Sequence, residues 1–155
     1  MTFQFAYGRR LAVAALALTV ALAPGLGLAA APSSPEDVVL DQPLSVLEKP
    51  ANQDKIGRDV TFLFAATAGP TPLEGRMRSH RKVINTGDPE RDCEVALVKT
   101  LEAMADLARK RGGNRVVALR SFWGGFPTSS TETYKCGRGK SVTGVSLIGV
   151  LESPK

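Results

Sequence analysis

The sequence predicts an α+β fold, in which a small mixed β-sheet packs against one long α-helix and a single disulfide closes the domain. Three observations lead to this prediction. Short apolar runs typical of strands lie on both sides of one long amphipathic segment, residues 89–111. The chain has two cysteines, and its 155 residues suffice for one hydrophobic core once the N-terminal segment is set aside.

The first 31 residues are typical of a secretory signal peptide. Two positive charges, Arg9 and Arg10, precede an apolar run from Leu11 to Ala23, and small residues follow it. This run is shorter than the roughly 20 residues that cross a membrane. We therefore expect cleavage after Ala29, or as far on as Ala31, rather than a retained anchor. The mature chain is expected to be periplasmic or secreted, with no stable membrane anchor.

Residues 32–42 are predicted to be a flexible leader, and residues 43–155 a single α/β domain. Both charges of the signal segment are Arg, so its removal lowers the formal charge from +5 to +3 (20 − 2 basic against 15 acidic). A charge this small is ordinary for a globular domain and predicts no nucleic-acid partner.

Ahead of the long helix we expect one helical turn and two strands. The turn covers Pro43 to Glu48 and ends at Pro50. Residues 60–65 are predicted as the first strand and residues 80–85 as the second. Between them, residues 69–72 are Gly-Pro-Thr-Pro, which predicts a loop.

The long helix is predicted from Pro89 to about Arg111, with Asp88 as its N-cap. Apolar residues recur every three or four positions on one face: Cys93, Leu97, Leu101, Met104 and Ala108. Cys93 is therefore expected to point toward the core near the start of the helix. The acidic residues at this end are expected to complement the helix dipole: Asp88, Glu90, Asp92 and Glu94.

Three strands are expected after the helix. Residues 115–120 form a continuous apolar run, which is typical of a strand covered on both faces. Residues 124–127 are predicted as a turn, and residues 132–136 as the next strand, with Cys136 at its end. The last strand covers residues 141–151, where Gly144 and Gly149 allow a bend or a bulge.

The two cysteines favour a disulfide because an exported chain with an even cysteine count is typical of such bridges. The alternatives to a bridge between Cys93 and Cys136 are two free thiols or a metal pair with His80. Two distant cysteines and one histidine match no zinc spacing, so no metal ligand and no cofactor are predicted. His80 is the only histidine and belongs to no recognisable catalytic set. We therefore predict that the chain is not an enzyme.

Two groups of residues are candidates for contact with a partner. Phe122, Trp123 and Phe126 lie beside two glycines and form either a partner-binding edge or packing at the end of the sheet. The second group is a basic stretch, predicted as a solvated loop, with contact to an anionic envelope surface as the alternative. It consists of Arg76, Arg78, His80, Arg81 and Lys82.

A set of motifs between Asp92 and Val150 carries a family resemblance. The motifs are a Cys at the start of a helix, the helix end Ala108-Arg109-Lys110-Arg111-Gly112-Gly113-Asn114, then Val116-Val117, Phe122-Trp123 and Thr133-Tyr134-Lys135-Cys136. In these the chain resembles small exported bacterial proteins that are often labelled excinuclease ATPase subunits. More distantly, it is similar to the YbjQ-type heavy-metal-binding family and to the globular domain of the Rcs-pathway envelope-stress lipoprotein.

The resemblance implies a shared fold and, through the YbjQ-type family, metal binding. ATPase chemistry is not expected, because Tyr134 stands where a phosphate-binding loop ending at Gly139-Lys140-Ser141 needs its first glycine. The chain also lacks the lipidated cysteine and the second cysteine pair of the lipoprotein. The leading functional prediction is a non-catalytic exported domain that binds an unknown partner or ligand in the cell envelope. Metal binding of the YbjQ-like type is the alternative.

Overall fold

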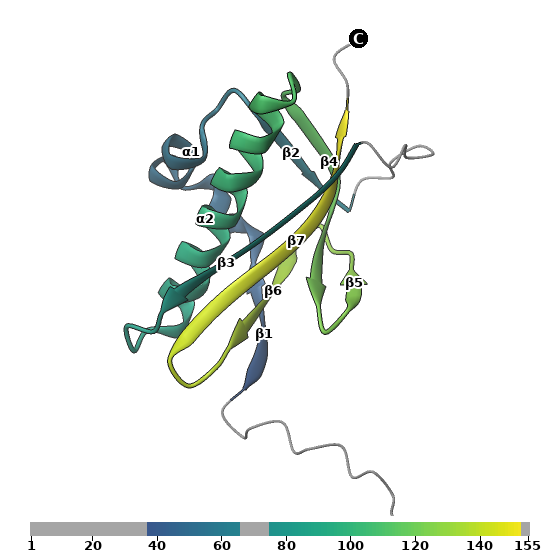
Figure 1. Cartoon of the computed structure of the whole chain (residues 1–155). Coiled ribbons are helices and arrows are strands. Elements are labelled where there is room, and N and C mark those ends of the chain that lie inside the picture. The colour runs from purple at the N-terminus through teal and green to yellow at the C-terminus, as the bar shows by residue number, and fades with distance from the viewer. Residues whose placement is uncertain (1–36, 66–74, 153–155) are drawn as a thin grey trace, which may run out of the picture. The chain divides into compact units, whose positions relative to one another are not determined.

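The computed structural model describes residues 37–65 and 75–152, which belong to one compact unit. It has the predicted α+β architecture, a mixed β-sheet with one long helix on one face (Figure 1). The elements are β1 Val38–Pro43, the 3₁₀ helix η1 Leu44–Glu48, α1 Pro50–Ile56, β2 Thr61–Phe64, β3 Arg76–Ile84, α2 Pro89–Lys110, β4 Arg115–Trp123, β5 Phe126–Thr128, β6 Thr133–Arg138 and β7 Val142–Glu152. The predicted signal peptide and the predicted loop at residues 69–72 lie outside the described residues.

Strand β7 organises the sheet. One of its edges pairs antiparallel with the whole of β3, and the other pairs first with β6 and then with β4. From this edge the sheet continues in two directions. Strand β1 pairs with β6, and strands β2 and β5 both pair with β4. Of the strand pairs that the structure describes, the pairing of β2 with β4 alone is parallel, which makes the sheet mixed.

Helix α2 forms as its sequence predicts. The Asp88 carboxylate accepts a hydrogen bond from the Arg91 backbone N–H at 3.1 Å, and Pro89 occupies the first turn. The predicted apolar face is fully buried against the sheet, mainly over β3 and β7. None of the helices in residues 37–65 and 75–152 combines the length and the hydropathy that a membrane crossing requires.

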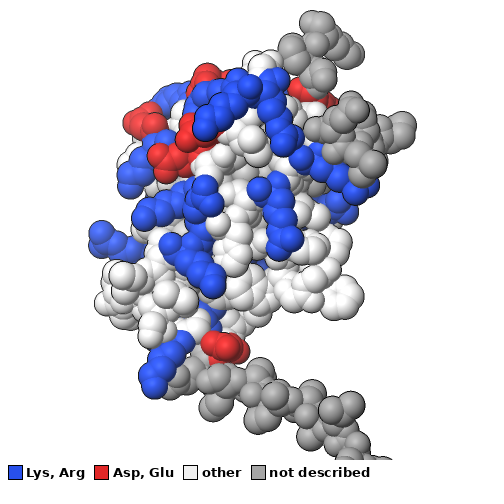
Figure 2. Space-filling view, viewed as in Figure 1, with Lys and Arg blue, Asp and Glu red and all other residues white. Residues whose placement is uncertain are grey.

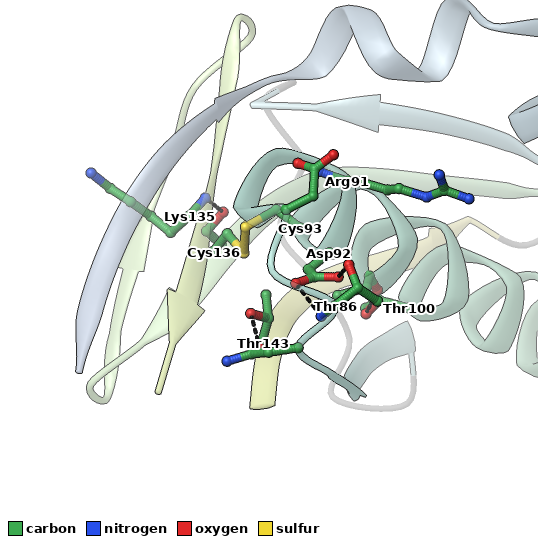
Figure 3. The surroundings of a disulfide bond; sticks show 12 residues. Thr86, Arg91, Asp92, Cys93, Thr100, Lys135, Cys136 and Thr143 are labelled. Atoms are coloured by element: carbon green, nitrogen blue, oxygen red, sulfur yellow. Dashed lines mark hydrogen bonds between the residues drawn. A yellow bond between two sulfur atoms is a disulfide. The ribbon is translucent and has the colours of Figure 1, made fainter. Parts of the chain in front are cut away.

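The predicted disulfide is present and joins the start of α2 to β6 (Figure 3). The Cα atoms of Cys93 and Cys136 lie 5.8 Å apart, and both side chains are buried. Beside the bridge, the buried Asp92 carboxylate accepts hydrogen bonds from the backbone N–H of Thr86 at 3.0 Å and from its hydroxyl at 2.7 Å. Asp92 therefore fixes the chain ahead of the helix, a more specific role than the predicted complementation of the dipole.

The structure corrects five predictions about local structure. Strand β1 begins at Val38, within the range predicted as a flexible leader, because Leu40 packs on the core and the strand pairs with β6. Pro50 begins the further helix α1 in addition to ending the first turn. The basic stretch lies on strand β3 rather than on a loop. The strand predicted at residues 80–85 is thus confirmed, but it begins earlier, at Arg76, and ends at Ile84. Phe126 begins the short strand β5, so four strands follow α2, and Cys136 lies inside β6 rather than at its end.

Strand β4 contains a bulge just before its aromatic end. At Ala118, β4 has one residue more than the facing segments of β2 and β7, so this residue has no partner in the register. Its φ of 50° lies in the left-handed region. The pairing of β7 with β3 continues without a break, so the irregularity lies in β4 and not at the glycines of β7. The bulge precedes the segment that carries Phe122 and Trp123.

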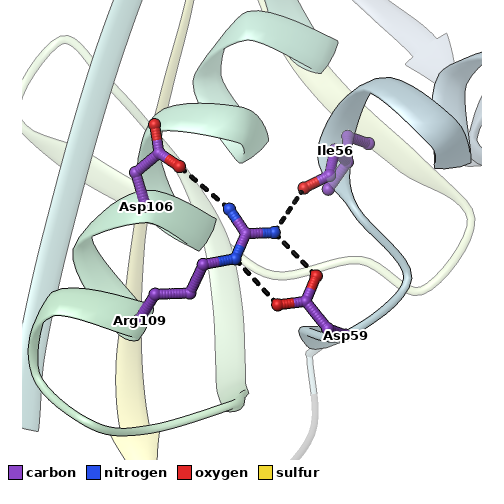
Figure 4. Close-up of polar contacts among 4 residues, drawn as sticks. All are labelled: Ile56, Asp59, Asp106 and Arg109. Carbon is purple, nitrogen blue, oxygen red and sulfur yellow. Dashed lines mark hydrogen bonds and ion pairs between the residues drawn. The ribbon is translucent and has the colours of Figure 1, made fainter.

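Arg109 near the end of α2 connects the helix to the segment after α1 (Figure 4). Its guanidinium donates to both carboxylate oxygens of Asp59, at 2.7 and 2.8 Å, and to Asp106 at 2.9 Å. A further hydrogen bond reaches the Ile56 carbonyl at 3.2 Å. Because Arg109 hydrogen-bonds the charged form of Asp59, it lowers the pKa of that carboxyl from 3.8 to about 2.

Candidate binding surface on the outer face of the sheet

The alternation of β3 separates its charged residues from its buried ones. Met77 and Ser79 are buried on the side of α2. Arg78, His80 and Lys82 occupy the alternate positions and lie on the opposite side, which we call the outer face of the sheet. In Figure 2, Lys and Arg side chains extend across the region of β3, whereas most of the visible Asp and Glu side chains lie over the helices.

The aromatic residues predicted as a partner-binding edge lie on one hairpin, and two of them contact β3. The Arg78 guanidinium carbon lies 4.6 Å from the centre of the Phe122 ring. The rings of His80 and Trp123 meet edge to face, with their centres 6.2 Å apart. Phe126, opposite Trp123 in the β4–β5 pairing, has 77% of its surface exposed. The structure therefore joins the two predicted groups into one surface.

Trp123 lies between two hollows of this surface. The first has a volume of about 200 Å³ and is lined by Arg78, His80, Phe122, Trp123, Gly124, Gly125 and Ser146. The second has a volume of about 420 Å³ and includes Lys82, Trp123 and Gly137 in its lining. The Trp123 ring lies so close to Gly137 that a Cβ atom at this position would collide with it. The glycine is thus required for the ring to lie where it does.

Three cations of the outer face lie outside the ion pairs of the described residues. Within residues 37–65 and 75–152, the side chains of Arg78, Lys82 and Arg120 take part in none of the ion pairs. Partial burial lowers the pKa of His80, and the charges of Lys82, Arg78 and Arg81 lower it further. The three cations near His80 make this part of the surface positively charged, which would favour an anionic ligand.

A larger hollow of about 660 Å³ lies between α1 and α2, but charges of both signs line it. Its lining includes the cations Lys55, Arg91 and Lys99 and the anions Asp88, Glu90, Glu94 and Glu102. Glu94 already accepts hydrogen bonds from Lys49 at 2.6 Å and from Asn52 at 2.7 Å. Because cations and anions are mixed in this groove, it does not favour a charged ligand of either sign, whereas the outer face favours an anion.

The disulfide limits the chemistry that the chain can perform while it is oxidised. Both sulfur atoms are in the Cys93–Cys136 bond, so neither is free as a thiolate nucleophile or as a metal ligand. In the part of the chain that the structure describes, no three His, Cys, Asp or Glu side chains are grouped to hold a metal ion. Comparison with protein-family models, with curated proteins and with solved structures gave no match. The family resemblance of the sequence therefore stays a prediction.

Two residues of this surface were not predicted from the sequence. Ser146 lies opposite His80 in the pairing of β7 with β3, and Arg120 lies opposite Ile148 of β7. Both become part of the surface only through the order of the strands. The sequence signal for this surface is the alternation of the basic residues Arg76, Arg78, His80 and Lys82, which indicates a strand with one polar face.

Proposed function

We propose that this chain is exported and works in the cell envelope as a non-catalytic domain that binds an anionic partner or ligand through the outer face of its sheet. The N-terminal charge pattern and apolar run support export. The disulfide supports it further, because such bridges persist in oxidising compartments.

One observation carries the binding role. The outer face combines the exposed Phe126 and the half-buried Phe122 and Trp123 with cations that form no ion pair among residues 37–65 and 75–152. Aromatic residues beside Arg are typical of the positions that contribute most to binding at protein interfaces. The excess of positive charge selects for negatively charged partners and increases their rate of association.

The alternative function, metal binding of the YbjQ-like type, has less support. The Cys93–Cys136 disulfide leaves neither sulfur atom free as a thiolate ligand. A metal would then depend on His80, the single histidine, and on carboxylates.

Sedimentation of the mature, oxidised protein with washed cell envelopes tests the proposal. We expect binding that weakens with salt, as screened charge attraction does, and that falls in Phe126→Ala. The control is Val95→Ala, which truncates a partly exposed apolar side chain in the groove between α1 and α2, away from the outer face. Equal binding of Phe126→Ala and the unmodified protein would contradict the proposed surface. Turnover of a substrate by the purified protein would contradict the non-catalytic role.

A further inference from the structure

Among the described residues, two polar side-chain atoms on the outer face are buried without a hydrogen-bond partner. They are the Ser146 hydroxyl oxygen and Nε of Arg120. Ser146 has only 3% of its surface exposed. An unpaired buried polar group costs about 1–3 kcal/mol, so such a group in a folded protein calls for an explanation, such as a ligand that completes its hydrogen bonds.

Ser146 lies in the smaller hollow beside Trp123, and the other side chains there suit an anion. Arg78 and His80 on β3 line the same hollow, and its described lining contains no Asp or Glu. Arg78 and the Ser146 hydroxyl are hydrogen-bond donors, and His80 offers a ring N–H. Donors from two strands can surround a group on more than one side, which suits a tetrahedral oxyanion.

The size of the hollow limits the ligand to a small group. Its volume of about 200 Å³ is below the roughly 300–1,000 Å³ of pockets that enclose drug-sized molecules. Gly124 and Gly125 form the tight turn at its rim with φ values of 61° and 88°, and they add no side chain that would close the opening. A single charged group could therefore enter while the rest of a larger ligand stays outside.

We infer that the hollow over Ser146 binds one oxyanion of the phosphate class, either free or carried on a lipid headgroup. The Ser146 hydroxyl donates to it from the floor, and Arg78 and His80 donate from β3. The inference rests on the proposed function, since it specifies the anionic group that the outer face receives.

Trp123 provides a direct readout, because it is the only tryptophan of the chain and lines the hollow. Inorganic phosphate should change its fluorescence in a saturable way, and chloride at equal ionic strength should not. Ser146→Ala should weaken phosphate binding at least about tenfold, the usual effect of a hydrogen bond to a charged group, and Arg78→Gln should weaken it similarly. The matched control is Arg91→Gln, which removes the same charge from the groove between α1 and α2 and should bind as the unmodified protein does.

A second readout separates loss of the ligand contact from loss of the fold. The unliganded Ser146→Ala protein should be no less stable than the unmodified protein, because the hydroxyl that it removes has no partner. A response that chloride reproduces, or equal phosphate affinity of Ser146→Ala and the unmodified protein, would overturn the inference.

Vesicles identify the source of the phosphate group. Phosphatidylcholine vesicles and vesicles with an equimolar share of phosphatidic acid are compared by sedimentation. Ser146-dependent binding to the second kind alone supports a lipid headgroup, whereas a response to inorganic phosphate alone supports a free ligand. If neither probe binds while Phe126→Ala still reduces envelope binding, this inference fails and the proposed function stands. If Phe126→Ala has no effect, the proposed function fails.

Discussion

Replacing both cysteines by alanine measures how much stability the Cys93–Cys136 disulfide supplies. The two residues are 43 positions apart in the sequence, and the chain-entropy model gives about 4 kcal/mol for a closed loop of this length. The whole domain is expected to have a free energy of unfolding of about 5–15 kcal/mol. The bridge therefore supplies a large part of it.

Urea unfolding of three samples separates the bridge from the packing of the side chains. The oxidised protein, the protein reduced under native conditions, and the double alanine variant are compared. We expect reduction alone to lower the free energy of unfolding by about 4 kcal/mol and the midpoint by about 2 M urea. The double variant should lose somewhat more, because both sulfur atoms are fully buried. A loss on reduction of less than about 1 kcal/mol would refute the reasoning that the bridge constrains the unfolded chain.

Three further substitutions test particular contacts. Asp59→Asn should lower the melting temperature above pH 3.8, where the unfolded carboxyl is charged, and the difference should disappear as the pH falls through about 2, the pKa in the folded state; a difference that does not vary with pH would contradict this. Ala118→Gly should raise the free energy of unfolding by up to about 1 kcal/mol in urea titrations, because glycine adopts the left-handed conformation of this residue without strain; a clear loss would show that the methyl group matters more than the backbone. Tyr134→Phe should raise the free energy of unfolding by about 1 kcal/mol in the same assay, because the buried hydroxyl has no partner; a loss of that size would reveal a partner for the hydroxyl.

The elements that could be predicted from the sequence are those whose signal is local. Helix α2 has an N-cap at Asp88, a proline in its first turn and an apolar face with regular spacing, and all three signals agree. The bridge followed from the cysteine count and from Cys93 on the buried face of that helix. Tertiary context was needed for none of these predictions.

The elements that were missed or misassigned depend on contacts with distant parts of the chain. Helix α1 is mostly polar, and the buried Asn52 is held by Glu94, 42 residues away. Strand β3 contains only two buried residues, Met77 and Ser79, so its strand pattern is weak beside its charges. Strand β1 is defined mainly by its pairing with β6, of which the sequence gives no local sign.

The candidate surface could be predicted only in parts. The aromatic pair Phe122-Trp123 and the basic stretch were each identified as possible contact regions, but no sequence pattern joins two segments about 40 residues apart. The basic stretch and the aromatic pair form one surface because β7 pairs with β3 on one edge and with β4 on the other. Ser146 is an ordinary serine in a strand until this arrangement places it in the hollow.

Export and disulfide formation are tested most directly by expressing the full sequence in a Gram-negative host and measuring the intact mass and the number of free thiols of the chain. The account predicts a periplasmic protein that begins between residues 30 and 32 and has no free thiol. A full-length protein in the cytosol with Cys93 and Cys136 both reduced would contradict it.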